Sequence, residues 1–355
     1  MKYKNGRFNI ENINVEKIAK KFGTPCYVYS YQNIENNIIN FKKNFKAIKP
    51  LICFSVKSNS NLRILNLIKK FNLGADVVSK GELMVALKAK IEPEKIVFSG
   101  VGKTINELKF AISKKILLIN AESESEIIEI EKIAKSNKRK VNIGLRFNPD
   151  TDANTLKNIS TGKKENKFGV NNKTFFELVN YCKNSKNIDL KCLSVHIGSQ
   201  ILSHKPYEKM LNVIDKTISR VKYKFKFIDL GGGMGISYTD KTKQLNYKKY
   251  NIAIKKFLKK HNSKIIFEPG RSIIGNVGTL ISRIIYIKRN EKKNFIILDA
   301  GMNDLIRPAL YGAFHNIVPT IRRQRKVKKI TEFVGPICES TDKFLSLKKF
   351  QKLNE

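Results

Sequence analysis

Cysteine is scarce in this chain, and long apolar runs are absent. The 355 residues include five cysteines, which are widely spaced and form no CxxC pair. This usage argues against a disulfide framework and against a zinc site. No apolar run approaches the roughly 18 residues of a membrane-spanning helix, and no apolar segment follows the polar N-terminus. We therefore expect a cytoplasmic protein with no membrane segment and no metal.

Acidic residues are also few. The chain has 30 Asp and Glu against 69 Lys and Arg, which gives a formal net charge of +39. Such a charge is typical of nucleic-acid-binding proteins. The lysines, however, are spread over predicted helix faces such as residues 63–71 and 252–264, with no arginine-rich arm and no aromatic RNA-binding signature. We expect no specific nucleic-acid site, only weak, salt-sensitive binding to polyanions.

Hydrophobic residues make up 41% of the chain and follow a repeating pattern between residues 51 and 275. In each repeat a short β-branched apolar run precedes a helical pattern with apolar residues three and four apart. Eight runs occur, at residues 51–56, 75–79, 95–100, 116–121, 141–147, 190–198, 225–232 and 264–270. Eight strand-helix units predict a (β/α)8 TIM barrel over residues 30–275, with an open doubly wound sheet as the alternative.

The pattern changes after residue 276. Residues 277–290, 293–301 and 325–338 alternate in hydrophobicity like antiparallel strands, with no helices between them. We expect a second, β-rich domain over residues 276–355, on which residues 1–29 pack. Few strands remain before the last residue, so we expect the C-terminal β-domain to be truncated.

Unusual polar residues gather where the predicted barrel strands end. Lys57 ends the first run and Asp76 lies in the second. His196 and Ser199 end the sixth run, and the glycine-rich stretch 229–235 (DLGGGMG) ends the seventh. Active sites of (β/α)8 enzymes form at these strand ends. A charge such as that of Lys57 directly behind a buried strand lies either at a rim or in a chemical role.

The glycines of the stretch 229–235 leave backbone N–H groups open to a phosphate. A dinucleotide fingerprint would need glycine at position 236, where isoleucine stands, so a Rossmann site fails on spacing. A simple tight turn is the other interpretation of these glycines.

Residues 268–271 (EPGR) end the eighth run. Glu268, held extended by Pro269, can face a cationic ring nitrogen, and a surface ion pair is the alternative. Gly270 offers a backbone N–H to an anion, and Arg271 can bind a carboxylate or phosphate through two parallel hydrogen bonds. His196 can stack on a flat cofactor or act as a base, and a buried core histidine is the alternative.

Cys338 is the cysteine with the strongest chemical signal. Gly335 and Pro336 fix its loop, and Glu339 and Asp342 flank the thiol with negative charge. Flanking carboxylates favour the protonated thiol, which suits an acid rather than a nucleophile. The other four cysteines are expected to be inert.

Together these motifs resemble the diaminopimelate decarboxylase family, whose members are pyridoxal-phosphate enzymes with a (β/α)8 barrel and a β-domain. The resemblance runs nearly end to end and rests on the order and joint presence of TPCYVYS, FSVKSN, GADVVSKGEL, FSGVGKT, NAESESE, FNPDTDANT, KFGV, HIGSQ, DLGGGMGI, EPGRS, DAGMNDLIRPALYGAFH and GPICESTD. Ornithine and arginine decarboxylases share the lysine, HIGS-like and glycine motifs. Glu339 directly after Cys338, and DAGMNDLIRPALY, favour diaminopimelate.

The resemblance implies pyridoxal 5'-phosphate as cofactor, bound to Lys57 as a Schiff base. It places eight further residues at the cofactor: Asp76, His196, Ser199, Gly233, Glu268, Pro269, Gly270 and Arg271. Of these, Glu268 would pair with the pyridine nitrogen and keep it protonated, and His196 would stack on the ring. The backbone of Gly233, Gly270 and Arg271 would bind the phosphate.

The implied reaction is decarboxylation of meso-2,6-diaminopimelate to L-lysine and CO2, the last step of lysine biosynthesis. Cys338 would be the proton donor and would come from the partner subunit, so the resemblance implies a homodimer with a shared active site. Arg271, Arg307 and Tyr311 would bind the distal carboxylate of the substrate, and Glu339 its distal amino group.

Two other functions stay open at this stage. One is a basic-amino-acid decarboxylase acting on ornithine, arginine or lysine. The other is a non-catalytic, truncated relative, because the family continues past the cysteine loop into a segment whose tyrosine contacts substrate and phosphate. No counterpart of that segment follows Asp342.

Overall fold

The computed structural model describes residues 1–239, 244–323, 326, 327, 329–351 and 353. The chain divides into two compact units. The barrel unit comprises the described parts of Glu35–Ile236 and Lys243–Asn276. The β-rich unit comprises the described parts of Met1–Ile34, Ser237–Thr242 and Val277–Glu355, so a short stretch after the seventh barrel strand belongs to it.

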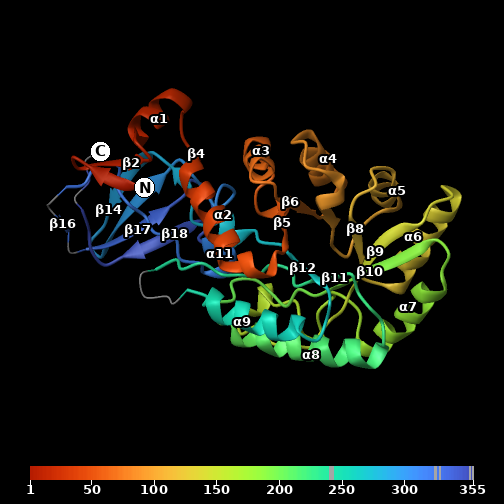
Figure 1. The fold of residues 1–355 in the computed structure, drawn as a ribbon. Coiled ribbons are helices and arrows are strands. Elements are labelled where there is room, and N and C mark those ends of the chain that lie inside the picture. The colour runs from red at the N-terminus through yellow and green to blue at the C-terminus, as the bar shows by residue number, and fades with distance from the viewer. Residues whose placement is uncertain (240–243, 324–325, 328, 352, 354–355) are drawn as a thin grey trace. The chain divides into compact units, whose positions relative to one another are not determined.

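Eight parallel strands close the barrel, and their order around it follows the chain (Figure 1). They are β5 (Leu51–Ser55), β6 (Gly74–Val77), β7 (Ile96–Phe98), β8 (Leu118–Ala121), β9 (Val141–Arg146), β10 (Ile188–Ser194), β11 (Phe227–Asp229) and β12 (Lys264–Phe267). Leu51 of the first strand pairs with Ile266 of the last, which closes the sheet. The predicted (β/α)8 barrel is confirmed, and the open doubly wound sheet is wrong.

Helices surround the barrel strands in Figure 1. They are α2 (Tyr31–Phe45), α3 (Leu62–Lys70), α4 (Lys80–Lys88), α5 (Ile105–Ser113), α6 (Glu124–Ser136), α7 (Asn172–Asn184), α8 (Lys205–Val221), α9 (Tyr247–Leu258) and α10 (Arg271–Ile274), with 3-10 turns at Lys46–Ile48, Val56–Ser58, Pro93–Lys95 and Lys157–Ile159.

Most loops that follow a barrel strand end at a capping side chain. The caps accept a backbone N–H from the first helical turn and are Asn61, Ser79, Thr104, Ser123, Asn171 and Asn246. Each such cap stabilises its helix by about 1 kcal/mol. The caps therefore fix the far ends of the loops that surround the site.

The β-rich unit holds four small sheets, with strand orders β1-β2-β3, β13-β4, β14-β15-β17-β18 and β16-β19. Its elements are β1 (Lys2–Lys4), β2 (Arg7–Ile10), β3 (Ile13–Asn14), α1 (Val15–Phe22), β4 (Cys26–Tyr29), β13 (Gly278–Ile281), β14 (Ile284–Arg289), β15 (Lys293–Leu298), α11 (Arg307–Tyr311), β16 (Lys326–Val327), β17 (Ile330–Val334), β18 (Lys343–Leu347) and β19 (Phe350–Gln351). The N-terminal strand β4 pairs antiparallel with β13.

The prediction of antiparallel strands without helices after residue 276 is wrong in two respects. Strand β15 pairs with β17 in parallel, and the short helix α11 lies between them in the chain. Alternating hydrophobicity reports which face of a strand is buried but not its direction. The long connection from β15 to β17 allows the chain to cross back and pair in parallel. Residues 325 and 328 of the predicted run 325–338 lie outside the described residues.

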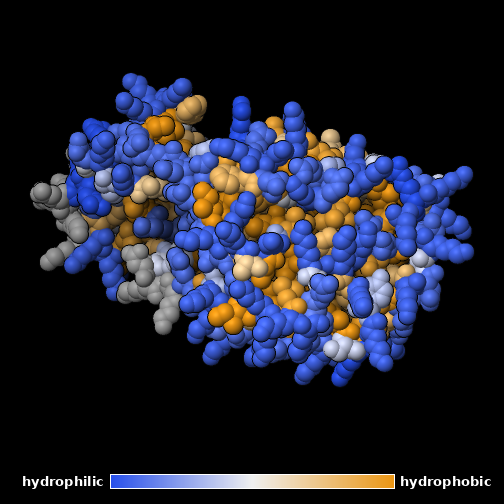
Figure 2. Space-filling model, viewed as in Figure 1, coloured by the Kyte–Doolittle hydropathy of each residue, from blue (hydrophilic) through white to orange (hydrophobic). Residues whose placement is uncertain are grey.

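Hydrophilic side chains are spread over the face of the molecule shown in Figure 2, with hydrophobic residues between them. In α9, Lys255 and Lys256 are exposed while Ile254 and Phe257 are buried. The lysines therefore occupy the outer faces of amphipathic helices. Within the described ranges, no helix combines the length and apolar character that crossing a membrane requires.

Candidate functional site

The barrel interior consists of an apolar layer followed by a polar one. Its buried apolar cluster is Cys53, Val97, Leu118, Cys192, Phe227 and Ile266. Two positions after each lies a buried polar residue: Ser55, Ser99, Asn120, Ser194, Asp229 and Glu268. Because strand side chains alternate between faces, residues two apart point the same way. Asp76 joins this polar layer two positions after Gly74, and the layer lies at the C-terminal ends of the strands.

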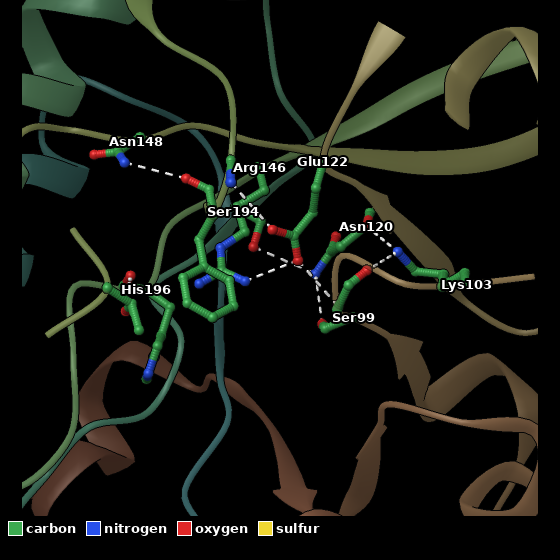
Figure 3. Close-up of polar contacts among 12 residues, drawn as sticks. Ser99, Lys103, Asn120, Glu122, Arg146, Asn148, Ser194 and His196 are labelled. Atoms are coloured by element: carbon green, nitrogen blue, oxygen red, sulfur yellow. Dashed lines mark hydrogen bonds and ion pairs between the residues drawn. The ribbon is translucent and has the colours of Figure 1, made fainter. Parts of the chain in front are cut away.

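Asn120 is at the centre of the polar layer (Figure 3). Its Nδ2 atom lies within hydrogen-bonding distance of Ser99 Oγ at 3.2 Å, Ser194 Oγ at 3.3 Å and Asp229 Oδ2 at 3.0 Å. A Cβ atom on Gly144 would come within 2.0 Å of Asn120 Oδ1, so glycine is required on β9 opposite this amide. The polar layer is thus held by contacts among four strands and the loop that follows β7.

Lys57 lies at the rim of this layer, in the turn after β5. Its Nζ donates to Asp76 Oδ2 at 2.8 Å, and Ser55 Oγ donates to the same oxygen at 2.7 Å. Desolvation lowers the pKa of Lys57, but the carboxylates of Asp76 and Glu268 outweigh it and raise the pKa above its ordinary value. The positive charge of Lys57, which directly follows a buried strand in the sequence, is therefore paired with Asp76 at the rim of the polar layer.

Glu268 is buried inside the polar layer and takes no part in a surface ion pair. Ser99 Oγ donates to its Oε1 atom at 3.2 Å. Burial raises the pKa of Glu268 well above its ordinary value, and the nearby carboxylates of Asp229 and Asp76 raise it further. The barrel therefore buries three carboxyl groups at these strand ends, of which Asp76 and Glu268 act on Lys57.

His196 lies in the loop after β10, against the glycine-rich turn. The backbone N–H of Gly232 donates to His196 Nδ1 at 3.2 Å, which leaves the proton of the neutral ring on Nε2. Burial, with the positive charges of Arg146 and Lys57, holds the pKa of His196 well below its ordinary value. A neutral, oriented ring of this kind suits stacking better than proton uptake.

The glycine-rich turn lies against other backbone. Gly233 has a φ of +85°, and a Cβ atom there would lie 2.2 Å from Gly198 O. A Cβ atom on Gly232 would lie 2.2 Å from Glu268 O. The backbone N–H of Ser199 donates to Ile159 O at 3.0 Å, which fixes the loop facing this turn. These contacts exclude side chains from the turn, in which Gly231 and Gly232 are buried and Gly233 is half-buried.

The segment after β12 brings the remaining predicted barrel residues to the same strand ends. Ser55 N–H donates to Pro269 O at 3.1 Å, and a Cβ on Gly270 would lie 3.1 Å from the Cβ of Ser55. Arg271 Nη1 donates to Gln200 Oε1 at 3.4 Å. The predicted residues from Lys57 to Arg271 therefore all belong to the barrel unit and gather at one end of the barrel.

Arg146 and Glu122 form a buried ion pair that the sequence analysis missed (Figure 3). Arg146 Nη1 donates to Glu122 Oε1 at 2.8 Å, and the guanidinium lies 4.8 Å from the centre of the Phe168 ring. Glu122 also accepts the backbone N–H groups of Gly100 and Gly169, each at 3.1 Å. This carboxylate therefore connects the loops after β7, β8 and β9. It also fixes the position of the Arg146 guanidinium, whose positive charge lowers the pKa of His196.

A second buried pair lies beside it. Lys103 Nζ, with 1% of its side chain exposed, donates to Glu126 Oε1 at 2.7 Å and to the carbonyl oxygens of Gly100 and Asn120. Glu126 Oε2 accepts the backbone N–H of Glu122 at 2.9 Å. Through this hydrogen bond, the Lys103–Glu126 pair fixes the backbone of Glu122, which is the counter-ion of Arg146.

The other predicted site residues belong to the β-rich unit. Arg307 begins α11 and Tyr311 ends it. Arg307 Nη1 lies 3.0 Å from His315 Nε2, and its guanidinium lies 5.0 Å from the centre of the Tyr238 ring. Tyr238 comes from the short stretch between the seventh barrel strand and α9, so this part of the chain positions Arg307.

Cys338 is exposed in the loop between β17 and β18. Thr341 Oγ1 donates to the neighbouring Glu339 carboxylate. Asp342, by contrast, is buried, and its Oδ1 and Oδ2 accept the backbone N–H groups of Met302 at 2.7 Å and Ile337 at 2.8 Å. Asp342 therefore fixes the cysteine loop to the Met302 turn, a structural role that the sequence analysis did not assign.

The barrel residues fit pyridoxal phosphate. Asp76 Oδ1 is buried and has no hydrogen-bond partner among the described residues, and Lys57 Nζ lies beside Asp76. The backbone of Gly233, which is half-buried and cannot carry a side chain without strain, can be approached by an anion. The Lys57 amine can react with the aldehyde of the cofactor, and a buried acid can pair with its basic ring nitrogen. The glycine backbone at the same end of the barrel can bind its phosphate.

A sequence signal for the missed polar layer exists. At seven strand ends an apolar or small residue is followed by any residue and then by a polar one. The seven triplets are CFS, GAD, VFS, LIN, CLS, FID and IFE. Taken singly, each triplet is unremarkable, but their common position in the strand-helix repeat predicts one inward polar ring. The Arg146 and Glu122 pair has no such signal, because it joins residues of adjacent strand ends.

Comparisons with known proteins agree with this architecture. A family model described as "Pyridoxal-dependent decarboxylase, pyridoxal binding domain" matches residues 31–275. The chain is 40% identical to diaminopimelate decarboxylase of Aquifex aeolicus over 351 residues, covering 98% of this chain and 82% of that protein. It is 41% identical to the Haemophilus influenzae enzyme of the same name, covering 96% of this chain and 83% of the other.

Solved structures give the same result. The crystal structure of diaminopimelate decarboxylase from Helicobacter pylori complexed with L-lysine is 41% identical, with a TM-score of 0.89 over 96% of this chain and 86% of that one. The crystal structure of diaminopimelate decarboxylase from m. jannaschii in co-complex with L-lysine is 31% identical, with a TM-score of 0.92. It covers 99% of this chain and 85% of that one.

Proposed function

This chain belongs to the diaminopimelate decarboxylase family of pyridoxal-dependent decarboxylases, and from that premise we propose that it converts meso-diaminopimelate to L-lysine and CO2. The observation that carries the proposal is the Lys57–Asp76 pair at the rim of a barrel layer that also buries Glu268. That arrangement supplies an amine for the cofactor aldehyde and acids for its ring.

In the proposed mechanism Lys57 holds pyridoxal phosphate covalently through Nζ, and Asp76 orients that amine. When bound, the cofactor supplies an electron sink for the bond that breaks on loss of CO2. Glu268 would hold the ring nitrogen of the cofactor in its protonated form. His196, neutral and fixed by the Gly232 N–H, packs on the ring face.

The phosphate is proposed to bind the backbone of the half-buried residues Gly233, Gly270 and Arg271. Ser199, in the loop facing the glycine turn, and Pro269 complete this part of the cofactor site. Glycine at position 233 supports the assignment, because its φ of +85° and the close approach to Gly198 O exclude a side chain there. Preformed N–H donors of this kind hold a dianionic phosphate without reorganisation.

The remaining groups are proposed to act on the substrate in an active site shared between the two subunits of a homodimer, to which the partner subunit contributes Cys338. Cys338 donates the proton that replaces the lost carboxyl group. Glu339 binds the distal amino group, and Arg307 and Tyr311, with Arg271, bind the distal carboxylate. A substrate without that carboxylate cannot form charge-assisted hydrogen bonds with the two arginines, which costs binding energy. The cytoplasmic location expected from the sequence stays a prediction.

Release of labelled CO2 from carboxyl-labelled meso-diaminopimelate, with added pyridoxal phosphate, tests the function. Ornithine is the competing substrate, Lys57→Ala removes the proposed cofactor lysine, and the exposed Lys69→Ala serves as the matched control. The proposal expects turnover of diaminopimelate in wild type and Lys69→Ala only. Preferred turnover of ornithine would assign the chain to the basic-amino-acid decarboxylases, and no turnover of either substrate would favour a non-catalytic relative.

Mixing two inactive variants tests the shared site. Lys57→Ala and Cys338→Ala each lack one proposed group, and subunit exchange between them forms heterodimers with one complete site. Equal amounts are expected to regain about a quarter of the wild-type sites, because half the dimers are mixed and each carries one complete site of two. Mixtures that stay inactive after proven subunit exchange would show that Lys57 and Cys338 of the same chain act in one site.

A further inference from the structure

Tyr207 and Tyr250 form a stacked pair of rings behind the glycine-rich turn. Tyr207 is the third residue of α8, Tyr250 lies on α9, and neither exposes any surface. Their ring centroids are 4.3 Å apart and the ring planes differ by 23°. Phe267, the last residue of β12, lies on the other side of Tyr250 at 6.0 Å between centroids. Packing from two helices and a barrel strand therefore fixes the position of the Tyr207 ring.

The two hydroxyl groups of this pair differ in their contacts. Tyr207 OH donates to Gly232 O at 3.1 Å and lies 3.2 Å from the point that a Cβ atom on Gly233 would occupy. Tyr250 OH is buried and has no hydrogen-bond partner among the described residues. A buried tyrosine hydroxyl usually has a partner, because burying it unpaired costs free energy. The pair therefore separates what the packed rings contribute from what the Tyr207 hydroxyl contributes.

The hydrogen bond from Tyr207 determines where the Gly233 N–H points. The Gly232 carbonyl and the Gly233 N–H belong to one trans peptide group, in which these two bonds point in opposite directions. With the carbonyl held by Tyr207, the N–H points away from that hydroxyl. On either side, the Gly232 N–H donates to His196 Nδ1 at 3.2 Å and the Gly233 carbonyl accepts the Ile201 N–H at 2.9 Å. No residue in the described part of the chain accepts the Gly233 N–H, so it remains available to an anion.

We propose that Tyr207 is a positioning residue, whose hydroxyl holds the Gly232 carbonyl so that the Gly233 N–H is presented to the phosphate of the cofactor. The assignment of the phosphate to this turn rests on the proposed function. An N–H group that is already oriented binds an anion without the cost of ordering the backbone first. Tyr250 contributes through the stacking of its ring alone, because its hydroxyl has no hydrogen-bond partner among the described residues.

Hydrogen exchange of the cofactor-free protein tests the hold on the turn. Tyr207→Phe keeps the stacked ring but removes the donor to Gly232 O, so the backbone amides of residues 231–235 are expected to exchange about fivefold faster. Mass spectrometry of the peptides that cover these residues measures the exchange. Tyr250→Phe removes the unpartnered hydroxyl of the same pair and is the matched control, with exchange as in wild type. Unchanged exchange in Tyr207→Phe, or equal acceleration in both variants, overturns the proposal.

Equilibrium titrations with pyridoxal phosphate and with 5'-deoxypyridoxal, which keeps the aldehyde and the ring but lacks the phosphate, test the link to the phosphate. Tyr207→Phe is expected to lower the affinity for pyridoxal phosphate about fivefold and to leave that for 5'-deoxypyridoxal unchanged, whereas Tyr250→Phe changes neither. An equal loss for both ligands, or no loss for either, overturns the proposal. A wild-type protein that binds both ligands equally well would contradict the phosphate site of the proposed function and leave the exchange result standing, so the two failures are distinguishable.

Discussion

The Nζ atom of Lys57 lies 2.8 Å from Oδ2 of Asp76, which has no exposed surface, whereas 49% of the Lys57 side chain is open to solvent. The pair raises the pKa of Lys57. A raised pKa keeps the amine protonated, and only the neutral amine attacks an aldehyde. The amine is therefore mostly protonated in the cofactor-free protein, and it must lose its proton before it can attach the cofactor.

Cofactor attachment is accordingly expected to speed up as pH rises from neutral to alkaline. Asp76→Asn removes the carboxylate, lowers the pKa of Lys57 and shifts this profile to lower pH. The rate is measured from the change in visible absorbance after mixing cofactor-free protein with pyridoxal phosphate. Asp152→Asn, which breaks an exposed ion pair with Lys163, should leave the profile unchanged. An identical profile in wild type and Asp76→Asn would refute the coupling.

Gly233→Ala is expected to weaken pyridoxal phosphate binding. Its φ of +85° and the 2.2 Å approach of a Cβ atom to Gly198 O force the turn to move, at a cost of about 1–3 kcal/mol. An equilibrium titration with pyridoxal phosphate measures the loss, which should be about tenfold or more. Gly102→Ala, where nothing lies within 4 Å of the added Cβ atom, is the matched control and should bind as wild type does.

Glu122→Gln should destabilise the barrel unit more than an ordinary surface change. The substitution leaves the buried Arg146 without its counter-ion and turns an acceptor of two backbone N–H groups into a mixed donor. Breaking a buried ion pair costs about 3–5 kcal/mol. Urea unfolding measures the loss against Glu124→Gln, a change at the exposed first residue of α6, two positions further along the chain. Equal stability of the two variants would show that the pair contributes nothing.

Asp342→Ala should reduce turnover without reducing cofactor binding. The backbone N–H groups of Met302 and Ile337 lose their acceptor, at about 1–3 kcal/mol each, and the Cys338 loop loses its anchor. The absorbance of the bound cofactor, which depends on the barrel unit, should persist while kcat falls. Glu291→Ala, an exposed change in the same unit, is the control. A normal kcat would show that the loop does not need this anchor.

The sequence predicted the barrel well because each strand-helix unit carries its own signal. Lys57, His196 and Glu268 stand out because a charged or polar group interrupts an apolar run. Asn120 and Asp229 do not, since their role depends on partners from three other strands that only closure of the barrel brings together. The parallel pairing of β15 with β17 was missed for a similar reason: strand direction is set by tertiary pairing, which alternation in one segment does not encode.

The central claim is that Lys57 carries the cofactor, and borohydride reduction followed by peptide mass mapping tests it most directly. The protein is loaded with pyridoxal phosphate, reduced to make the attachment permanent, and digested. The account predicts one modified lysine, Lys57, and no modification in Lys57→Ala. A modification on a different lysine, or none on loaded wild type, would contradict the account.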